Sequence, residues 1–130
     1  MSKPKVLISD KMDSNAARIF EERGCDVDVK PGMSPDELKA VIGDYHGLAI
    51  RSSTKVTPEI LDAATNLKVI GRAGIGVDNV DIPYASGKGV VVMNTPFGNS
   101  ITTAEHAIAM MMALARQIPE ANTRTKAGEW

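Results

Sequence analysis

Short apolar runs alternate with segments of helical periodicity along residues 5–93. Runs this short are typical of strands that are buried on both faces of a parallel sheet. Parallel neighbours need right-handed crossovers, and helix-like segments stand between the runs. The sequence therefore predicts an α/β fold with a doubly wound, mostly parallel sheet that helices cover on both faces. Four strands are expected at the apolar runs 5–9, 47–50, 67–70 and 90–93, and another at 25–30, where apolar and polar residues alternate.

Two of the connecting segments carry helix start signals. Ser34, Pro35 and Glu37 have the spacing of a capping box with proline at the first helical position, and Thr57 precedes another such proline. Residues 77–89 instead contain scattered acids, a proline and two glycines, without apolar periodicity. We therefore expect them to form an irregular connector.

A different element follows at 99–119, where most side chains of the central turns are apolar. Thr102 and Glu105 have capping-box spacing, and Pro119 is expected to end the helix. A helix that is apolar all round must be covered on several sides, either inside a larger domain or at a subunit interface. The polar tail after Pro119 leads into no strand, so we expect the chain to be a fragment of a longer protein.

Bulk properties narrow the function classes. The net charge is −1 without long blocks of like charge, so the basic footprint of a nucleic-acid-binding protein is missing. The single Cys25 cannot form an intramolecular disulfide, and the first residues lack the apolar core of a secretory signal, which favours a cytoplasmic protein. The longest apolar run, 107–115, is far shorter than the roughly 18 residues of a membrane span.

Polar residues follow several of the predicted strands. Ligands of open α/β sheets bind beyond the carboxyl ends of the strands. Guanidinium groups and free backbone amides at such an edge recognise carboxylate or phosphate groups, so we predict a site for a small anion. The residues at these strand ends are Ser9, Asp10, Arg51, Ser52, Ser53, Arg72, Gly74, Gly76, Asn94 and Thr95.

The glycine loop "GRAGIGVDN" at 71–79 allows three interpretations. Its G-x-x-G-x-G spacing reverses the G-x-G-x-x-G of a dinucleotide-binding turn, and no apolar helix pattern follows to hold a pyrophosphate. The glycines could also serve only a tight bend. The interpretation that we favour is an anion site built from the backbone amides of the loop.

Neither histidine is assigned a catalytic role. His46 is expected at a helix end or the surface, and His106 is expected to be buried and hydrogen-bonded in the apolar helix. The two histidines and Cys25 are far apart in sequence, so no zinc-ligand spacing exists and no metal site is expected.

Three segments resemble the D-isomer-specific 2-hydroxyacid dehydrogenases, in particular the branch that acts on 3-phosphoglycerate. They are "RSSTKVT" at 51–57, "LKVIGRAGIGVDNVD" at 67–81 and "VVMNTPFGNSITTAEHAIAMMMALAR" at 91–116. The resemblance implies a flavodoxin-like substrate-binding domain over 1–98. It further implies that 99–130 contain an interdomain helix and the start of a Rossmann-type NAD domain, most of which lies beyond Trp130. Residues 101–118 of this helix are expected to join subunits into a homo-oligomer.

The same resemblance implies roles for individual residues. Arg51 and Ser52 would face the substrate, the amides of the glycine loop would hold its carboxylate, and Ile75 would also lie near the nicotinamide of NAD. Relatives often have threonine or valine at the position of Ile75. The implied substrate-binding residues are Arg51, Ser52, Gly74, Ile75, Gly76 and Asn99.

The implied activity is the NAD-dependent oxidation of 3-phosphoglycerate to 3-phosphohydroxypyruvate in serine biosynthesis. The family's catalytic arginine, glutamate and histidine are expected beyond Trp130, so no catalytic residue is assigned and the fragment alone is expected to be inactive. One alternative is a dehydrogenase for another D-2-hydroxy acid, such as glycerate or lactate. A second is a non-enzymatic flavodoxin-like module, such as a receiver domain with Asp10 as its phosphoacceptor.

Overall fold

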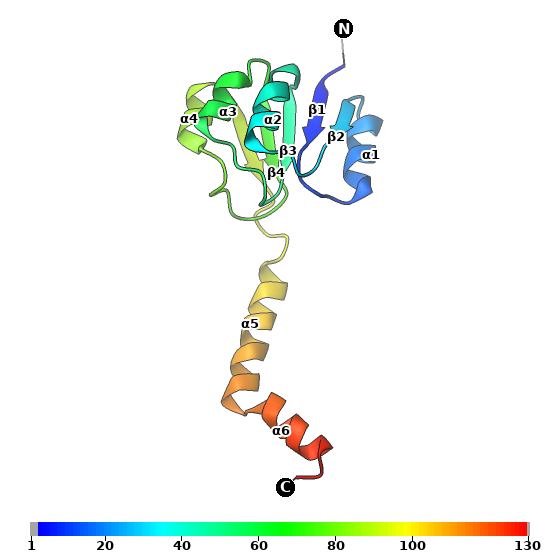
Figure 1. Ribbon diagram of the computed structural model, residues 1–130, viewed down its shortest axis with the longest axis vertical. Helices are drawn as coiled ribbons and strands as arrows, with labels where there is room; N and C mark the ends of the chain where they lie inside the picture. The colour runs from blue at the N-terminus through cyan, green and yellow to red at the C-terminus, as the bar shows by residue number, and fades with distance from the viewer. Residues whose placement is uncertain (1–2, 130) are drawn as a thin grey trace. The chain divides into compact units, whose positions relative to one another are not determined.

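The structure, a computed structural model, describes residues 3–129. The chain divides into two compact units, one ending at Pro96 and the other beginning at Phe97. The first unit contains the sheet, and the second contains two helices (Figure 1). The expected division into 1–98 and 99–130 lies close to this boundary, and the roles expected for the two parts remain predictions.

The first unit is built on a fully parallel five-stranded sheet in the order β2-β1-β3-β4-β5. This confirms the predicted α/β class and the parallel sheet. All four residues of β3 are buried, as expected for the middle of such a sheet. The strands are β1 (Lys5–Ile8), β2 (Asp26–Val29), β3 (Gly47–Ile50), β4 (Val69–Arg72) and β5 (Val91–Asn94).

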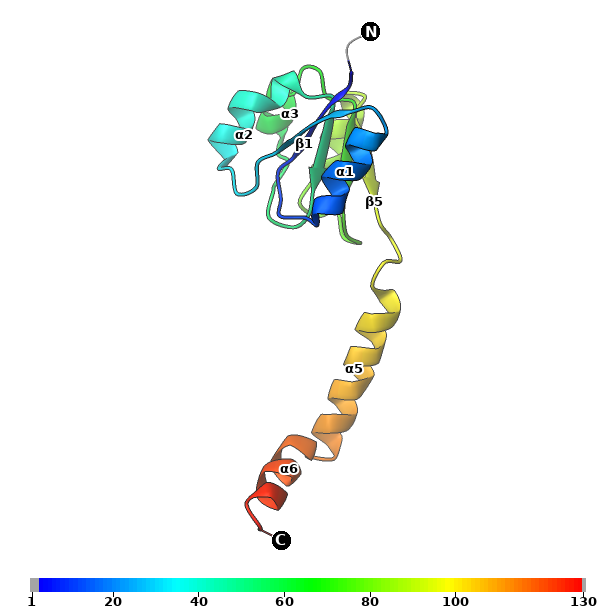
Figure 2. The ribbon, with the colours of Figure 1, turned by 90° about the vertical axis from the view of Figure 1, so that its right-hand side faces the viewer.

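Helices lie on both sides of the sheet. Figure 2 shows α1 (Ser14–Glu22) on one side of the strands and α2 (Pro35–Val41) and α3 (Pro58–Ala63) on the other. The predicted capping box of α2 is confirmed: the Ser34 amide donates to Glu37 Oε2 at 2.7 Å, and the Glu37 amide donates to Ser34 Oγ at 3.3 Å. A short 3-10 helix, η1 (Ile42–Asp44), continues from α2 toward β3.

The core fills the space between the sheet and the helices α2, α3 and α4 (Ile82–Gly87). Each fully buried leucine or isoleucine contributes roughly 1.5–3 kcal/mol relative to an exposed one. The side chains of this core that are 2% exposed or less are Leu7, Ile42, Tyr45, Leu48, Ile50, Val56, Leu61, Ile70 and Ala85.

The other face of the sheet is only partly covered in the first unit. A groove of about 390 Å³ runs between α1 and the strands β3, β4 and β5. It exists because small residues, Gly47, Ala49 and Gly71, stand where the other face has leucine and isoleucine. The expectation of helices on both faces is thus met in full only on the side of α2, α3 and α4.

The prediction that 77–89 form an irregular connector was wrong, because the helix α4 lies within these residues. The side chain of Asp81 caps this helix by accepting from the Tyr84 amide at 3.0 Å, and a proline stands in its first turn. The helix has six residues and only Ala85 is buried, so its sequence shows no periodic pattern of apolar residues from which a helix could be predicted. The strand predicted at 67–70 also lies two residues later, so Gly71 and Arg72 belong to β4.

The second unit consists of α5 (Ser100–Ala115) and α6 (Ile118–Lys126), and neither contains a buried residue. Three local expectations were wrong. Asn99 is the N-cap of α5 and no side chain caps it, so the Thr102–Glu105 box is not formed. His106 is exposed instead of buried. Pro119 does not end the first helix but stands in the first turn of α6, because the backbone turns at Gln117, which lies in the left-handed region at φ 49°.

Neither of these helices, nor any other in the described part of the chain, is long and apolar enough to cross a bilayer.

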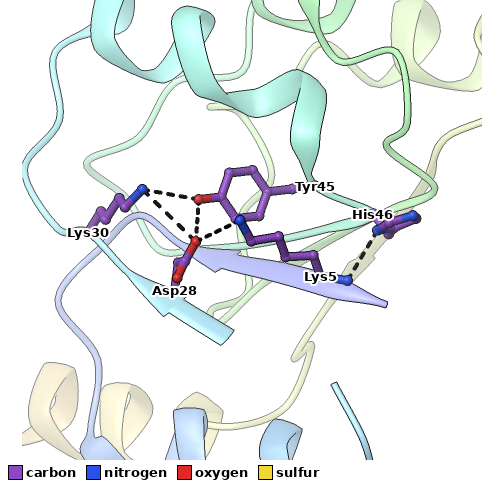
Figure 3. Close-up of polar contacts among 5 residues, drawn as sticks. All are labelled: Lys5, Asp28, Lys30, Tyr45 and His46. Atoms are coloured by element: carbon purple, nitrogen blue, oxygen red, sulfur yellow. Dashed lines mark hydrogen bonds and ion pairs between the residues drawn. The ribbon is translucent and has the colours of Figure 1, made fainter. Parts of the chain in front are cut away.

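A polar cluster joins the start of the sheet to the end of η1 (Figure 3). The Tyr45 hydroxyl donates to Asp28 Oδ2 at 2.6 Å, and Lys5 Nζ lies 3.2 Å from the same oxygen. Lys30 Nζ donates to the Tyr45 hydroxyl at 3.2 Å, and the Lys5 amide donates to His46 Nδ1 at 3.1 Å. The ring of Tyr45 is buried, so its hydroxyl links the core to β2, and burial and the Asp28 carboxylate raise the pKa of Tyr45 to about 12.

We expect Tyr45→Phe to lower the free energy of unfolding by about 1–2 kcal/mol, because it removes a hydrogen bond to a charged group while leaving the buried ring in place. Urea denaturation measures the effect. Tyr84→Phe is the matched control, because the Tyr84 hydroxyl also donates to an aspartate, Asp62, at 2.8 Å, but from an exposed ring. An equal or larger loss in the control would contradict this assignment.

The same cluster predicts a pH dependence. The hydrogen bond from Tyr45 and the Lys5 ammonium hold the pKa of Asp28 below its ordinary value. Stability from such a group is present above its unfolded pKa of about 3.9 and is lost as the pH falls through the lower folded pKa. The stability difference between the wild type and Asp28→Asn should therefore shrink between about pH 6 and about pH 3 in urea titrations. A difference that stays constant over this range would contradict the prediction.

Candidate functional site

The parallel sheet brings the ends of four strands to one edge. In the register of the sheet, Ile8 pairs with Ala49, Ile50 with Arg72, and Arg72 with Asn94. The residues that follow β1 and β3 therefore lie side by side, as do the residues that follow β4 and β5. The predicted meeting of polar residues at the carboxyl edge is confirmed for the first unit.

Asp10 organises this edge. It is 3% exposed, and its Oδ2 accepts from the amides of Arg51 at 2.6 Å, Ser53 at 3.2 Å and Thr54 at 3.2 Å. Its Oδ1 accepts from the Thr54 hydroxyl at 2.7 Å, and Thr54 Oγ1 also lies 2.9 Å from Ser9 Oγ. Burial by itself would raise the pKa of Asp10, but the hydrogen bonds hold it below the ordinary value. The carboxylate thus stays charged.

The loop at 51–54 presents the predicted substrate residues. The side chains of Arg51 and Ser52 are exposed, and the only hydrogen bond that the Arg51 guanidinium makes within residues 3–129 is from Nη1 to the Lys11 carbonyl at 3.2 Å. The remaining donors of the guanidinium are available to an anion. A planar fork of this kind suits a carboxylate or a phosphate.

Asn79 holds the same loop from its other side. Its Nδ2 donates to the carbonyls of Arg51 and Thr54, both at 2.7 Å. The backbone carbonyl of Asn79 accepts from the Val56 amide at 2.8 Å, next to a parallel bridge between Val56 and Val80. The 51–54 loop and the end of the glycine loop are therefore joined by hydrogen bonds.

The glycine loop has two free amides. The Gly74 amide donates to the Arg72 carbonyl at 2.9 Å, whereas the amides of Ile75 and Gly76 donate to nothing within the described residues. The loop is fixed from β5, because the Thr95 amide donates to the Gly74 carbonyl at 2.9 Å and Asn94 Nδ2 donates to the Ile75 carbonyl at 2.7 Å. The loop thus offers adjacent N–H groups on a fixed backbone, as an anion site requires.

The loop does not have the structure of a pyrophosphate-binding turn. Such a turn runs directly into a helix N-terminus, but α4 begins only at Ile82 and its N-cap is the carboxylate of Asp81. An acidic cap competes with a phosphate for the same amides. The guanidinium of Arg72 also lies in the space that a Cβ at Gly74 would need, so a larger residue there would have to displace this side chain.

The other predicted site residues stay predictions. Ile75 is 40% exposed, which leaves its side chain free to meet a ligand. Asn99 belongs to the second unit, at the N-cap of α5. The structure adds Asp10 and Asn79, which the sequence reasoning did not single out as organisers of the site. The signal for Asp10 was an acid directly after a buried strand, but its partners lie more than forty positions away.

The geometry speaks against the receiver alternative. A phosphoacceptor aspartate needs an accessible oxygen as nucleophile. Asp10 is 3% exposed, and both of its carboxylate oxygens accept hydrogen bonds from the 51–54 loop. It acts as a structural acceptor instead.

Comparison with known proteins places the chain in a family. Residues 6–127 match the D-isomer specific 2-hydroxyacid dehydrogenase, catalytic domain. Over 126 residues the chain is 49% identical to D-3-phosphoglycerate dehydrogenase of Archaeoglobus fulgidus and 50% identical to that of Synechocystis sp.. The alignments cover 97% of this chain but only 24% and 23% of these relatives, so the chain spans about a quarter of their length.

A solved structure agrees with this placement. The NAD+-bound 3-phosphoglycerate dehydrogenase of Entamoeba histolytica superimposes with a TM-score of 0.75 and 32% identity, over 86% of this chain and 39% of that chain. The family match extends over nearly all of the residues that build the parallel sheet and its carboxyl edge. The chain therefore belongs to the family of D-isomer-specific 2-hydroxyacid dehydrogenases.

Proposed function

We propose that the chain is the N-terminal part of an NAD-dependent D-3-phosphoglycerate dehydrogenase, which oxidises 3-phosphoglycerate to 3-phosphohydroxypyruvate. The observation that carries the proposal is the identity of about half of all residues to enzymes of that name, over 97% of the chain. The anion-binding chemistry at the carboxyl edge supports it independently. In this proposal 1–98 form the substrate-binding domain, and 99–130 lead into the nucleotide-binding domain.

The substrate carries two anionic groups, and the first unit offers two sets of donors. Arg51 and Ser52 would bind the substrate from the 51–54 loop, and the free amides of Ile75 and Gly76 would hold its carboxylate. Gly74 would contribute by placing the two free amides that follow it, because its own amide already donates to the Arg72 carbonyl. Asn99, the N-cap of α5, is the remaining residue to which we assign a role in substrate binding.

The described residues suit substrate binding better than nucleotide binding, because the glycine loop runs into no helix N-terminus. NAD, when bound, would accept the hydride from C2 of the substrate. Ile75 is the residue proposed to lie beside the nicotinamide. We assign proton transfer to neither histidine, and His46 Nδ1 already accepts from the Lys5 amide.

We also propose that α5 pairs subunits. Its side chains are almost all exposed and mostly apolar, including Ile108, Met111 and Leu114 at 56%, 62% and 81% exposed. Uncovered apolar surface of this extent favours association with another surface. The single half-buried Cys25 is consistent with the proposed cytoplasmic location, where thiols stay reduced.

The full-length protein with NAD should oxidise 3-phosphoglycerate with a kcat/KM at least about tenfold above that for D-glycerate or D-lactate, because only the phosphorylated acid uses both sets of donors. The measurement is the rate at which reduced nicotinamide forms, followed by its absorbance. A preference for an unphosphorylated acid would place the protein in another branch of the family.

We expect Arg51→Ala to raise the KM for 3-phosphoglycerate by about tenfold to a hundredfold, because it removes charge-assisted hydrogen bonds to an anion. Arg18→Ala is the control, since Arg18 is also exposed but pairs with Glu22 on α1. Steady-state kinetics with saturating NAD measures both. An unchanged KM in Arg51→Ala would refute the role given to this arginine.

A further inference from the structure

The peptide groups of Arg51 are fixed on both sides by side chains from other parts of the chain. Its N–H donates to Asp10 Oδ2 at 2.6 Å, and its C=O accepts from Asn79 Nδ2 at 2.7 Å. The Arg51 side chain itself is exposed. A backbone held so closely fixes the point and the Cα–Cβ direction from which the Arg51 side chain extends.

The Thr54 end of the loop is held in the same way. Its N–H donates to Asp10 Oδ2 at 3.2 Å, and its C=O accepts from Asn79 Nδ2 at 2.7 Å. Asp10 thus supplies acceptors to the amides of the loop, and Asn79 supplies donors to its carbonyls. The two side chains approach from different segments: Asp10 lies two residues after the end of β1, and Asn79 is the last residue of the glycine loop.

Asp10 has no ion pair within residues 3–129. A buried carboxylate without a cation is costly unless several donors surround it. Here three amides and one hydroxyl do so. An apolar side chain would avoid the cost of burying a charge, but it would leave three amides of the loop without acceptors. The carboxylate is therefore matched to this loop conformation.

We propose that Asp10 and Asn79 are a pair of positioning residues that clamp the 51–54 loop, so that Arg51 is held toward the substrate and the loop is coupled to the free amides of Ile75 and Gly76. The assignment of a substrate rests on the proposed function. The clamp itself rests only on the hydrogen bonds of the first unit.

Asp10→Ala in the full-length protein tests the clamp. We expect the KM for 3-phosphoglycerate to rise about tenfold, while the KM for NAD changes less than about twofold, because the loop holds the substrate and not the nucleotide. Asp28→Ala is the matched control: it also removes a hydrogen-bonded carboxylate from the first unit, but at the Tyr45 cluster. Equal KM values for 3-phosphoglycerate in both variants would overturn the proposal.

Asp10→Asn separates positioning from acid–base chemistry. The amide oxygen can accept from the three loop amides, and its NH2 can donate to Thr54 Oγ1, which then donates to Ser9 Oγ. We therefore expect Asp10→Asn to keep the KM within about threefold of the wild type. A loss of kcat as large as that of a catalytic residue would show that the carboxylate acts chemically and would overturn the positioning role.

Hydrogen exchange supplies a readout that does not depend on activity. In Asp10→Ala the amides of Arg51, Ser53 and Thr54 should exchange at least about tenfold faster, and in Asp28→Ala they should not change. If the wild type oxidised no 2-hydroxy acid, the proposed function would fail, yet the exchange rates would still decide whether the clamp exists. Unchanged exchange in Asp10→Ala would overturn the clamp.

Asn79→Ala keeps the proposal testable if Asp10→Ala does not fold. It removes the donors to the carbonyls of Arg51 and Thr54 while leaving the buried carboxylate in place. We expect the same rise in the KM for 3-phosphoglycerate, with a smaller change in the KM for NAD. Asn66→Ala is its control, because Asn66 Nδ2 likewise donates to a distant carbonyl, that of Gly43 at 2.6 Å, away from the carboxyl edge. Equal KM values in these two variants would overturn the proposal.

Discussion

The parallel register of the strands is the constraint on which the site depends. Side chains alternate between the two faces along a strand, so a shift of the register by one residue would turn every side chain of that strand to the opposite face. The pairing of Ile8 with Ala49 puts Asp10 beside the backbone of Arg51, and the pairing of Arg72 with Asn94 puts the glycine loop beside β5. The core residues on the side of α2, α3 and α4 hold this register, because Leu7, Leu48 and Ile70 are buried only in it.

The buried carboxylate of Asp10 extends that register into the loops. Loops after parallel strands lack a hydrogen-bond ladder of their own, so their conformation depends on side chains that reach them. The Asp10 carboxylate accepts hydrogen bonds from the amides of the 51–54 loop, and Asn79 Nδ2 donates hydrogen bonds to its carbonyls. This allows Arg51 and Ser52 to be exposed to a ligand without being mobile at the backbone, which reduces the entropy lost on binding.

The elements with strong local signals were predicted well. Four of the strands appeared as apolar runs, and the strand at 25–30 as an alternation of apolar and polar residues. The start of α2 was predicted from Ser34, Pro35 and Glu37, because capping is a contact between residues three apart. The helix α4 was missed, since six residues with one buried alanine have no periodicity to read. The break at Gln117 was also missed, because a glutamine in the left-handed region has no sequence signature.

The sequence by itself determined the fold class, the family and the residue types at the carboxyl edge, because these follow from local apolar patterns and from motifs that are continuous in the chain. Only the tertiary structure decided which of those residues meet. Asp10 and Arg51 are far apart in sequence, and their hydrogen bond exists because β1 and β3 are neighbours in the sheet. The tertiary structure likewise decided that the Gly74 amide is engaged while those of Ile75 and Gly76 are free, since a hydrogen bond depends on atomic position and not on residue type.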